Sequence, residues 1–129
     1  AYKHAIQLDP DYPAAYRDMG VTLYNLQRYD EALDACRNAI QLEPDNPIAY
    51  YNMGIFLFKL KQYEEALDRY QHAHRLDPND ADIYENKGIV LNAMGRYDEA
   101  IDAYKYALRL DPKRAYKYER YIQESPMDN

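Results

Sequence analysis

The chain has 129 residues, of which 47% are hydrophobic and 29% charged, and its formal net charge is −6. This composition is typical of a folded domain rather than a disordered chain. The acidic balance argues against nucleic-acid binding, which requires clustered positive charge. No apolar run approaches the roughly 20 residues of a membrane span, and no signal-peptide pattern opens the chain. We therefore expect neither nucleic acid nor membrane as a partner and predict a cytoplasmic protein.

A fixed period runs through the whole sequence. Glycines, alanines and prolines recur at one constant spacing (54 − 20 = 88 − 54 = 34), namely Gly20, Gly54 and Gly88; Ala32, Ala66 and Ala100; and Pro10, Pro44, Pro78 and Pro112. A period of this length indicates stacked units that cannot bury their apolar faces alone. Function is then expected on the surface that stacking creates.

Residues 1–12 read as an incomplete repeat that consists of a second helix only. Its apolar positions match those of the next second helix, with Tyr2, Ala5, Ile6 and Leu8 in the places of Cys36, Ala39, Ile40 and Leu42. Nothing upstream covers this face. We infer either a longer parent array or a contact with another molecule.

Three complete repeats are predicted at residues 13–46, 47–80 and 81–114, each a pair of helices. In the first, Tyr16, Met19, Gly20 and Leu23 recur at helical spacing, and a second apolar stripe follows from Ala32. A glycine inside a helix costs about 1 kcal/mol relative to alanine. We expect Gly20 and its two counterparts to allow close approach of the second helix at the recurring alanines.

The second helices are predicted to begin at Tyr29, Tyr63 and Tyr97, each followed by two acidic residues. Paired carboxylates are also used in acid–base catalysis. In the first turn of a helix, however, acidic side chains interact favourably with the helix dipole, and this explanation accounts for all three copies. These helices should end at Leu-Asp-Pro or Leu-Glu-Pro, because a residue before proline is disfavoured in a helix. Asn46 and Asp80 are predicted N-caps of the following first helices.

The single cysteine, Cys36, stands where the other repeats have Tyr70 and Tyr104. We interpret it as a buried thiol that fills core space, because the pattern supplies no activating base. His4 and His72 share a repeat position, but Asn38 separates them in the array, and His74 replaces an apolar residue. No metal spacing, phosphate-binding loop or catalytic triad is present, so we predict no enzyme activity, no metal and no cofactor.

After Pro112 a final helix is predicted at residues 115–124, followed by a tail at 125–129. Its apolar stripe is one-sided, and the period places Ile122 where a glycine would stand, so this helix is interpreted as a cap. Basic residues near it, Lys113, Arg114, Lys117 and Arg120, have two interpretations. They are either a site for phosphate or an acidic peptide, or side chains that solvate a terminal helix.

The recurring pattern resembles the tetratricopeptide repeat (TPR) family. The residues that carry the resemblance are Tyr16, Met19, Gly20, Ala32 and Pro44; Tyr50, Met53, Gly54, Ala66, Tyr70 and Pro78; and Tyr84, Gly88, Ala100, Tyr104 and Pro112. Lys87 departs from the pattern in an apolar position. The resemblance implies an all-α fold, a right-handed superhelical solenoid of helix-turn-helix hairpins in a single domain.

The resemblance also implies a protein-protein interaction scaffold, in which first helices line a concave groove that binds a peptide or protein segment. The residues expected in that groove are Arg17, Val21, Tyr24, Tyr51, Asn52, Ile55, Phe58, Lys59, Asn86 and Ile89. The wider set of positions on this side also includes Asp18, Ile48, Asp82 and Glu85. Val21, Ile55 and Ile89 form an apolar file that points to a ligand, unless neighbouring helices bury it.

A second file on this side consists of Asn52 and Asn86, with Asp18 as its first member. A carboxamide offers donors and an acceptor together, so it can hold the backbone of an extended peptide. Chaperone-docking members of the family instead clamp a terminal carboxylate with lysines, asparagines and an arginine. Here Asp82 would repel that carboxylate, and Asn52 alone matches, with Arg17 as a partial substitute, so the sequence argues against this subclass.

An alternative function is homotypic assembly. The uncovered N-terminal face and the tyrosine-rich cap, which contains Tyr118 and Tyr121, are two apolar ends of one stack. A head-to-tail contact between them would be heterologous and could continue from copy to copy.

Overall fold

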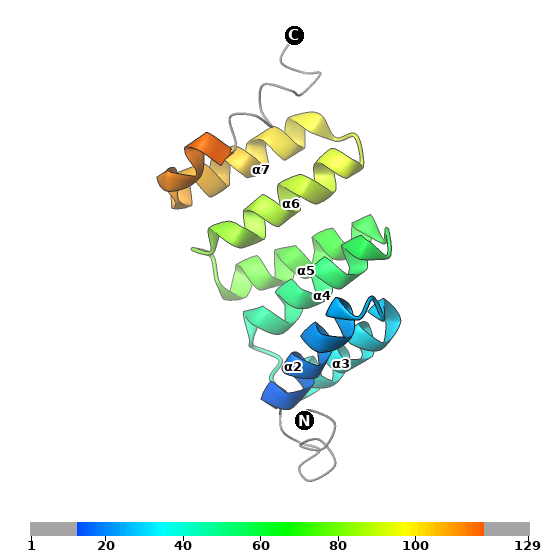
Figure 1. The fold of residues 1–129 in the computed structure, drawn as a ribbon. Coiled ribbons are helices and arrows are strands. Elements are labelled where there is room, and N and C mark those ends of the chain that lie inside the picture. Colours follow the sequence, from blue (N-terminus) through cyan, green and yellow to red (C-terminus); the bar gives the residue numbers. More distant parts are fainter. Residues whose placement is uncertain (1–12, 118–129) are drawn as a thin grey trace. The chain divides into compact units, whose positions relative to one another are not determined.

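The computed structural model describes residues 13–117, which form helices and the turns between them (Figure 1). The helices are α2 (Pro13–Asn25), α3 (Tyr29–Leu42), α4 (Pro47–Lys59), α5 (Tyr63–Leu76), α6 (Ala81–Ala93) and α7 (Tyr97–Leu110). A short 3-10 helix, η1 (Pro112–Arg114), follows α7, and residues 115–117 are again helical. The predicted all-α class is confirmed. Among the helices described, none has the length and apolar character needed to cross a bilayer.

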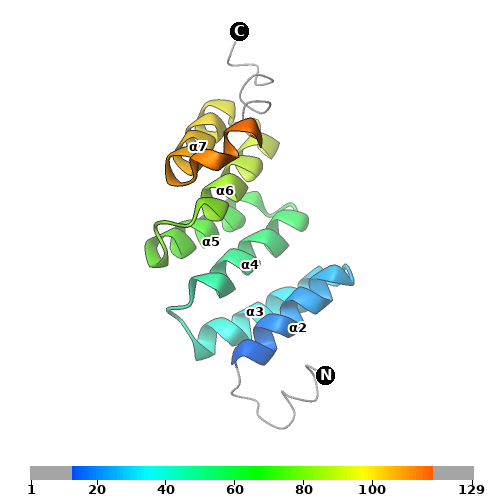
Figure 2. The same ribbon diagram turned by 60° about the vertical axis from the view of Figure 1, so that its left-hand side comes forward.

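Consecutive helices pack in pairs as hairpins, α2 with α3, α4 with α5 and α6 with α7 (Figure 1 and Figure 2). The chain falls into two compact units, Ala1–Leu76 and Asp77–Asn129. The first unit contains the first two hairpins, in which α4 contacts both α2 and α3; the second contains the third hairpin. The predicted division into an incomplete repeat, three repeats and a cap stays a prediction, and residues 1–12 and 118–129 lie outside the described part.

The sequence signals at the helix ends act as predicted. Asn46 Oδ1 accepts a hydrogen bond from the Ile48 amide at 3.0 Å, and Asp80 Oδ1 accepts one from the Asp82 amide at 2.9 Å. Each N-cap thereby satisfies one of the unpaired amides at the start of a helix. The second helices end at Leu42, Leu76 and Leu110, two residues before a proline.

The turn inside each hairpin adopts a left-handed conformation at the same repeat position. The φ angle is +62° at Gln27, +62° at Lys61 and +78° at Gly95. The following amide donates to a carbonyl five residues earlier, as in the 2.9 Å bond from Gln62 N to Leu57 O. The hydrogen bond caps a carbonyl at the end of the first helix. The left-handed conformation favours glycine over residues that carry a side chain.

The explanation expected for the glycines names the wrong partner at Gly54 and Gly88. A Cβ atom on Gly54 would lie 2.5 Å from the ring of Tyr70, and one on Gly88 would lie 2.5 Å from the ring of Tyr104. Both rings are buried, so the glycines make room for a tyrosine of the second helix rather than for a small alanine. The cause is the size of the aromatic ring, which crosses the hairpin and reaches the facing backbone.

In the first hairpin the ring next to the glycine comes from a different helix. A Cβ on Gly20 would meet Ala32 O and Phe56 Cε2 at 3.5 Å and Cys36 Sγ at 3.6 Å, which are ordinary contacts. At this glycine the expected alanine is among the neighbours, through its backbone carbonyl. Phe56 comes from α4 in the second hairpin, is 2% exposed, and stacks on Tyr24 with a centroid distance of 4.9 Å. Cys36 therefore does not fill the position alone: Phe56 supplies the ring that the short side chain of Cys36 lacks.

Candidate functional site

One stripe of side chains runs along α2 and another along α4, two helices that contact each other. On α2 the stripe follows the spacing i, i+3, i+7, and on α4 it follows i, i+4, i+7, i+11, so each stripe occupies one helix face. We call these residues the α2–α4 face: Asp18, Val21 and Asn25 on α2, and Ile48, Asn52, Ile55 and Lys59 on α4. The two helices contact each other within the first compact unit.

The centre of the α2–α4 face is apolar and accessible. Val21 is 41% exposed and Ile48 is 55% exposed, and both are among the few large apolar side chains left open in the described residues. Ile55 is half-buried, while Asp18, Asn25 and Lys59 are exposed around them. Exposed apolar side chains rimmed by polar ones are typical of interaction surfaces.

The two predicted asparagines differ in what they already bind. Asn86 Nδ2 donates to the carbonyl of Asp82 at 2.9 Å, one turn earlier in its own helix α6. Asn52 is half-buried, and its carboxamide makes no hydrogen bond to any residue in the described range. Because Asn52 lies between Ile48 and Ile55 on α4, its donors and acceptor face the same side as the apolar centre.

The aromatic residues that were predicted to line the groove also pack against other rings of the protein. Tyr24 contacts Tyr29 at a centroid distance of 5.5 Å in addition to Phe56, and Phe58 contacts Tyr63 at 5.6 Å. Tyr51 lies 6.0 Å from the Tyr70 ring. All three predicted rings are half-buried, so they are neither sealed inside nor fully open.

Arg17 has an internal partner. Its Nη1 donates to Glu43 Oε1 at 2.6 Å, and its side chain is only 23% exposed. This ion pair joins α2 to the residue that follows α3. Arg17 therefore ties the first hairpin together, and the predicted ligand role would require breaking this pair.

The remaining predicted residues, Asn86 and Ile89, lie on α6 in the second compact unit and are half-buried. The other eight predicted residues lie on α2 and α4, two helices that contact each other, whereas these two lie in the third hairpin. Near them, Asp82 and Glu85 of α6 form ion pairs with Arg114, and Glu85 also pairs with Lys117. The sequence suggested either a ligand site or solvation of a terminal helix for Arg114 and Lys117. Neither interpretation included ion pairs with carboxylates of the same chain.

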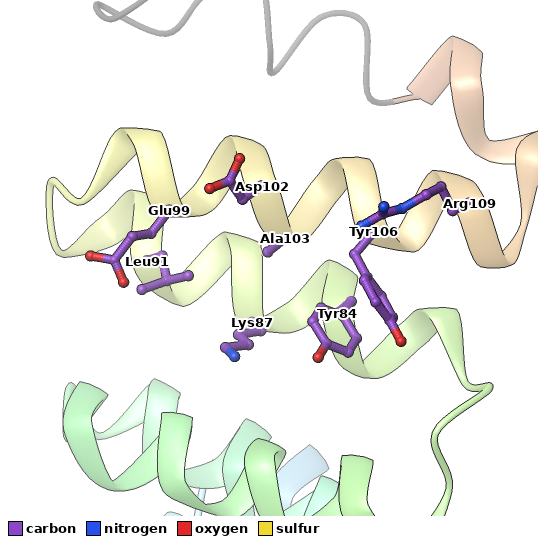
Figure 3. A pocket seen from close by; sticks show the side chains of 8 residues that line it. All are labelled: Tyr84, Lys87, Leu91, Glu99, Asp102, Ala103, Tyr106 and Arg109. Carbon is purple, nitrogen blue, oxygen red and sulfur yellow. The ribbon is translucent and has the colours of Figure 1, made fainter.

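The third hairpin also holds a cavity of about 320 Å³ between α6 and α7 (Figure 3). The Tyr84 and Tyr106 rings stack at a centroid distance of 4.1 Å beside it, with Lys87 Nζ 5.3 Å from the Tyr84 centroid. Desolvation lowers the pKa of Lys87, which stands in an apolar repeat position. The remaining lining residues are Leu91, Glu99, Asp102, Ala103 and Arg109.

The stacked pair beside this cavity recurs in the second hairpin. There, at the equivalent repeat positions, Tyr50 and His72 stack with a centroid distance of 3.9 Å and an interplanar angle of 10°. The Tyr50 hydroxyl also donates to the carbonyl of Pro44 at 3.0 Å. The ring pair is thus a repeating packing contact between the two helices of a hairpin, and it does not single out the third hairpin as a ligand site.

The residues considered for catalysis have structural surroundings. Cys36 is 2% exposed, and burial raises the pKa of its thiol to about 12, so little thiolate forms near neutral pH. In the described part of the chain, no group of three or more His, Cys, Asp or Glu side chains is placed to hold a metal ion. His72 stacks on Tyr50, and His74 is half-buried.

Sequence reasoning missed Phe56 and the Arg114 ion pairs. Phe56 stands where the first and third repeats have Thr22 and Val90, so its exceptional size, together with the exceptional smallness of Cys36, was the available signal. For Arg114 the signal was the acid at position 85, where the first repeat has Arg17. A change of charge at an otherwise regular position indicates a changed partner.

Family models of the tetratricopeptide repeat match most of the chain. One described as tetratricopeptide repeat matches residues 45–113, a second with the same description matches residues 1–34, and one described as TPR repeat matches residues 22–61. The first alone covers more than half of the 129 residues. Among curated proteins, no sequence matches this chain.

Solved structures agree with the family models. A crystal structure of MamA is 27% identical with a TM-score of 0.84, over 97% of this chain and 82% of that one. MamA from Desulfovibrio magneticus RS-1 is 28% identical with a TM-score of 0.84, over 94% and 68%. The TPR2B domain–pHsp70 complex of yeast Sti1 shares the fold at 20% identity and a TM-score of 0.83, over 91% and 98%. The chain belongs to the tetratricopeptide repeat family.

Proposed function

We propose that the protein is a scaffold that binds an extended segment of a partner protein on the α2–α4 face. The observation that carries the proposal is the exposure of Val21 and Ile48 on neighbouring helices, beside the Asn52 carboxamide that makes no hydrogen bond within the described residues. Family membership supports the coarser part, a protein-interaction scaffold. The Sti1 domain, whose solved structure is a complex with pHsp70, illustrates that this fold can carry a bound partner.

The chemistry of the face favours a segment with apolar side chains and an accessible backbone. Val21, Ile48 and Ile55 offer apolar contacts of about 1.5–3 kcal/mol each when fully buried. The Asn52 carboxamide can pair with a peptide N–H and C=O for about 0.5–1.5 kcal/mol per hydrogen bond. Association costs about 4–15 kcal/mol, so we expect micromolar or weaker affinity from these hairpins alone.

Selection of peptides from a random display library on the immobilised chain tests this proposal. Affinities of the selected peptides are then measured by calorimetry for the native chain, Val21→Ser, Ile48→Ser and Asn52→Ala. Because each apolar anchor contributes more than about 1.4 kcal/mol, either serine variant should weaken binding about tenfold or more. Asn52→Ala should weaken it about threefold to tenfold.

The matched control is Leu42→Ser, which removes an apolar side chain that is 36% exposed at the end of α3, outside the α2–α4 face. This variant should bind selected peptides like the native chain. Peptides that bind Val21→Ser and Ile48→Ser with native affinity, or that lose affinity for Leu42→Ser instead, would place recognition on another surface.

We infer further that binding involves no catalysis and that the protein acts in the cytoplasm. The buried Cys36 thiol, with its raised pKa, is poorly suited to act as a nucleophile, which supports the first inference. Assay of the purified chain for hydrolysis of generic ester and phosphate substrates tests it, and fractionation of cells tests the second. A partner that the chain converts rather than holds would contradict the scaffold role.

Homotypic assembly stays a prediction, because Tyr2, Ala5, Ile6, Leu8, Tyr118 and Tyr121 lie outside the described residues. Light scattering over a concentration series distinguishes it from the monomeric scaffold. If the mass grows with concentration and this growth disappears in the double variant Tyr118→Ser/Tyr121→Ser, assembly is favoured. A constant monomer mass would contradict the assembly hypothesis.

A further inference from the structure

The α2–α4 face has a polar layer on each side of its apolar centre. Val21 on α2 and Ile55 on α4 occupy equivalent repeat positions, and the polar residues before and after them are equivalent in the same way. Both helices run from the end of the unit where the α3–α4 loop lies to the hairpin turns (Figure 1 and Figure 2). Successive layers are therefore one helical turn apart, which is about 5 Å. In order along both helices, the layers are Asp18 with Asn52, Val21 with Ile55, and Asn25 with Lys59.

Each polar layer carries one charge, and the fold requires neither of them. Asp18 stands where the other two repeats have asparagine, and Lys59 stands where they have asparagine and alanine. Both residues are exposed, and neither forms an ion pair with another residue of the described range. Arg17, the cation next to Asp18 on α2, is already paired with Glu43. The face therefore presents a negative charge on α2 and a positive charge on α4, on opposite sides of the apolar layer.

This diagonal of charges has the length of a short extended segment. The two charged residues are two layers apart along the helices, and the axes of helices in contact are typically 8–10 Å apart, so they are separated by roughly 10–15 Å. An extended chain covers that distance in about three to five residues.

We propose that the partner of the α2–α4 face is a bipolar segment, with a basic residue against Asp18, an acidic residue against Lys59 and apolar side chains between them over Val21 and Ile55. The inference rests on the proposed function and names the chemistry of its partner. Because both charges are exposed, each ion pair should change affinity only about twofold to fivefold. Their main effect is on the choice of partner, since a segment with two acidic or two basic ends brings like charges together.

Selection from a random display library on immobilised full-length chains tests the bipolar partner. The native chain should enrich peptides that carry one basic and one acidic residue on opposite sides of an apolar pair. Lys59→Glu leaves two acidic residues on the face and should enrich peptides with two basic residues. Asp18→Lys makes the reciprocal change on the other helix and should enrich peptides with two acidic residues.

The matched control is Lys61→Glu. It makes the same charge change as Lys59→Glu at an exposed residue, but in the turn after α4 and outside the α2–α4 face. This variant should select the same bipolar peptides as the native chain. A change of pool in Lys61→Glu equal to that in Lys59→Glu would mean that net charge, rather than the position of Lys59, sets the preference, and would overturn the proposal.

Calorimetry with one peptide selected on the native chain measures the pairing directly. Lys59→Glu should weaken its binding about threefold to tenfold at about 50 mM NaCl, and the loss should shrink at about 0.5 M NaCl because salt screens exposed charges. Replacing the acidic residue of the peptide with lysine should recover most of this loss on Lys59→Glu and weaken binding to the native chain.

The outcomes separate this inference from the proposed function. A native pool without paired charges, or pools from Lys59→Glu and Asp18→Lys that match the native pool, would overturn the bipolar partner. If Val21→Ser and Ile48→Ser still weaken binding in that case, the face stands and the assignment of charges alone fails. Peptides that bind both serine variants with native affinity, or a library that yields no binding peptide, would contradict the proposed function and the bipolar partner together.

Discussion

The three repeated glycines have different surroundings, and they should respond differently to the same substitution. A methyl group on Gly54 or Gly88 would press on the buried ring of Tyr70 or Tyr104, so alanine should destabilise the fold by about 1–3 kcal/mol despite its better helix propensity. Gly20→Ala meets only ordinary contacts and should be neutral or stabilising by up to about 1 kcal/mol.

Urea unfolding followed by circular dichroism measures this contrast among the glycine variants. Gly20→Ala is the matched control, because it makes the same change at the same repeat position. Equal destabilisation of all three variants would mean that helix crossing, rather than the tyrosine ring, sets the need for glycine.

His72 should make stability depend on pH. Burial lowers its pKa below the usual value, and repulsion by Arg75 and Arg69 adds to the effect. A depressed pKa means that the folded state disfavours the charged imidazole. The stabilising contribution is therefore complete above the unfolded pKa of about 6.5 and is lost as the pH falls towards the lower folded value.

The change in urea midpoint between pH 7.5 and pH 5.0 tests this prediction. His72→Asn, which introduces the residue that the first repeat has at Asn38, should show a smaller loss than the native chain. Comparison of the two chains removes the contribution of carboxylates. An identical loss in both would contradict a role for His72.

Sequence predicts crowding at all three glycines, since glycine inside a helix needs a reason, but this is wrong at position 20, where a Cβ would make only ordinary contacts. Sequence could predict that positions 54 and 88 are crowded. It could not predict what crowds them, because helical spacing gives the face of a residue but not how far a side chain on the facing helix reaches. The same limit applies to Asn52 and Asn86. Their repeat position is shared, but only Asn86 bonds back to its own helix.

At the scale of the element, the hairpin turns carry strain that glycine would relieve. Lys61 adopts φ +62°, where Gly95 stands in the third hairpin. A left-handed residue with a side chain costs roughly 1–2 kcal/mol relative to its usual conformation, and glycine avoids most of it. Lys61→Gly should therefore stabilise the chain by up to about 1 kcal/mol, which thermal unfolding can measure.

The control for the turn is Gln62→Gly, one residue further along the chain. Gln62 precedes α5 and has no left-handed φ, so glycine there should destabilise through the added freedom of the unfolded chain. Destabilisation by both substitutions to a similar extent would show that the turn at Lys61 is not strained.

Helix boundaries were the most predictable part of this fold. Proline after Leu42, Leu76 and Leu110, together with Asn46 and Asp80 as caps, fixed them by local chemistry that does not depend on packing. Ion pairs between elements could not be predicted in the same way. Arg114 binds Asp82 across 32 residues, and only the folded hairpin brings the two together.

At the scale of the whole molecule, the two compact units should differ in independent stability. The first contains two hairpins that share a core through Phe56, whereas the second contains one hairpin and the segment after α7. Domains below about 60 residues are marginally stable, and single repeats cannot bury their apolar faces alone. As separate fragments, residues 1–76 should unfold cooperatively in urea and residues 77–129 should show a broad transition with less helix.

Circular dichroism of the two fragments checks this prediction, with the full chain as the control. Equally sharp transitions for both would mean that one hairpin suffices for a stable core. The period could not reveal this division, because the repeat spacing continues unchanged across Leu76 and Asp77. Family and fold class could be predicted from the period, since they depend on it directly.

The ring that Phe56 inserts beside Gly20 has a consequence for how such proteins can be rebuilt. Modules of one family are often treated as interchangeable, to be duplicated or reordered at will. Here the second module carries a bulky side chain that its upstream neighbour accommodates only because it has Cys36 in place of tyrosine. Splicing the second module behind a copy of itself would bring Phe56 and Tyr70 to the same space, so the first two modules must be moved together.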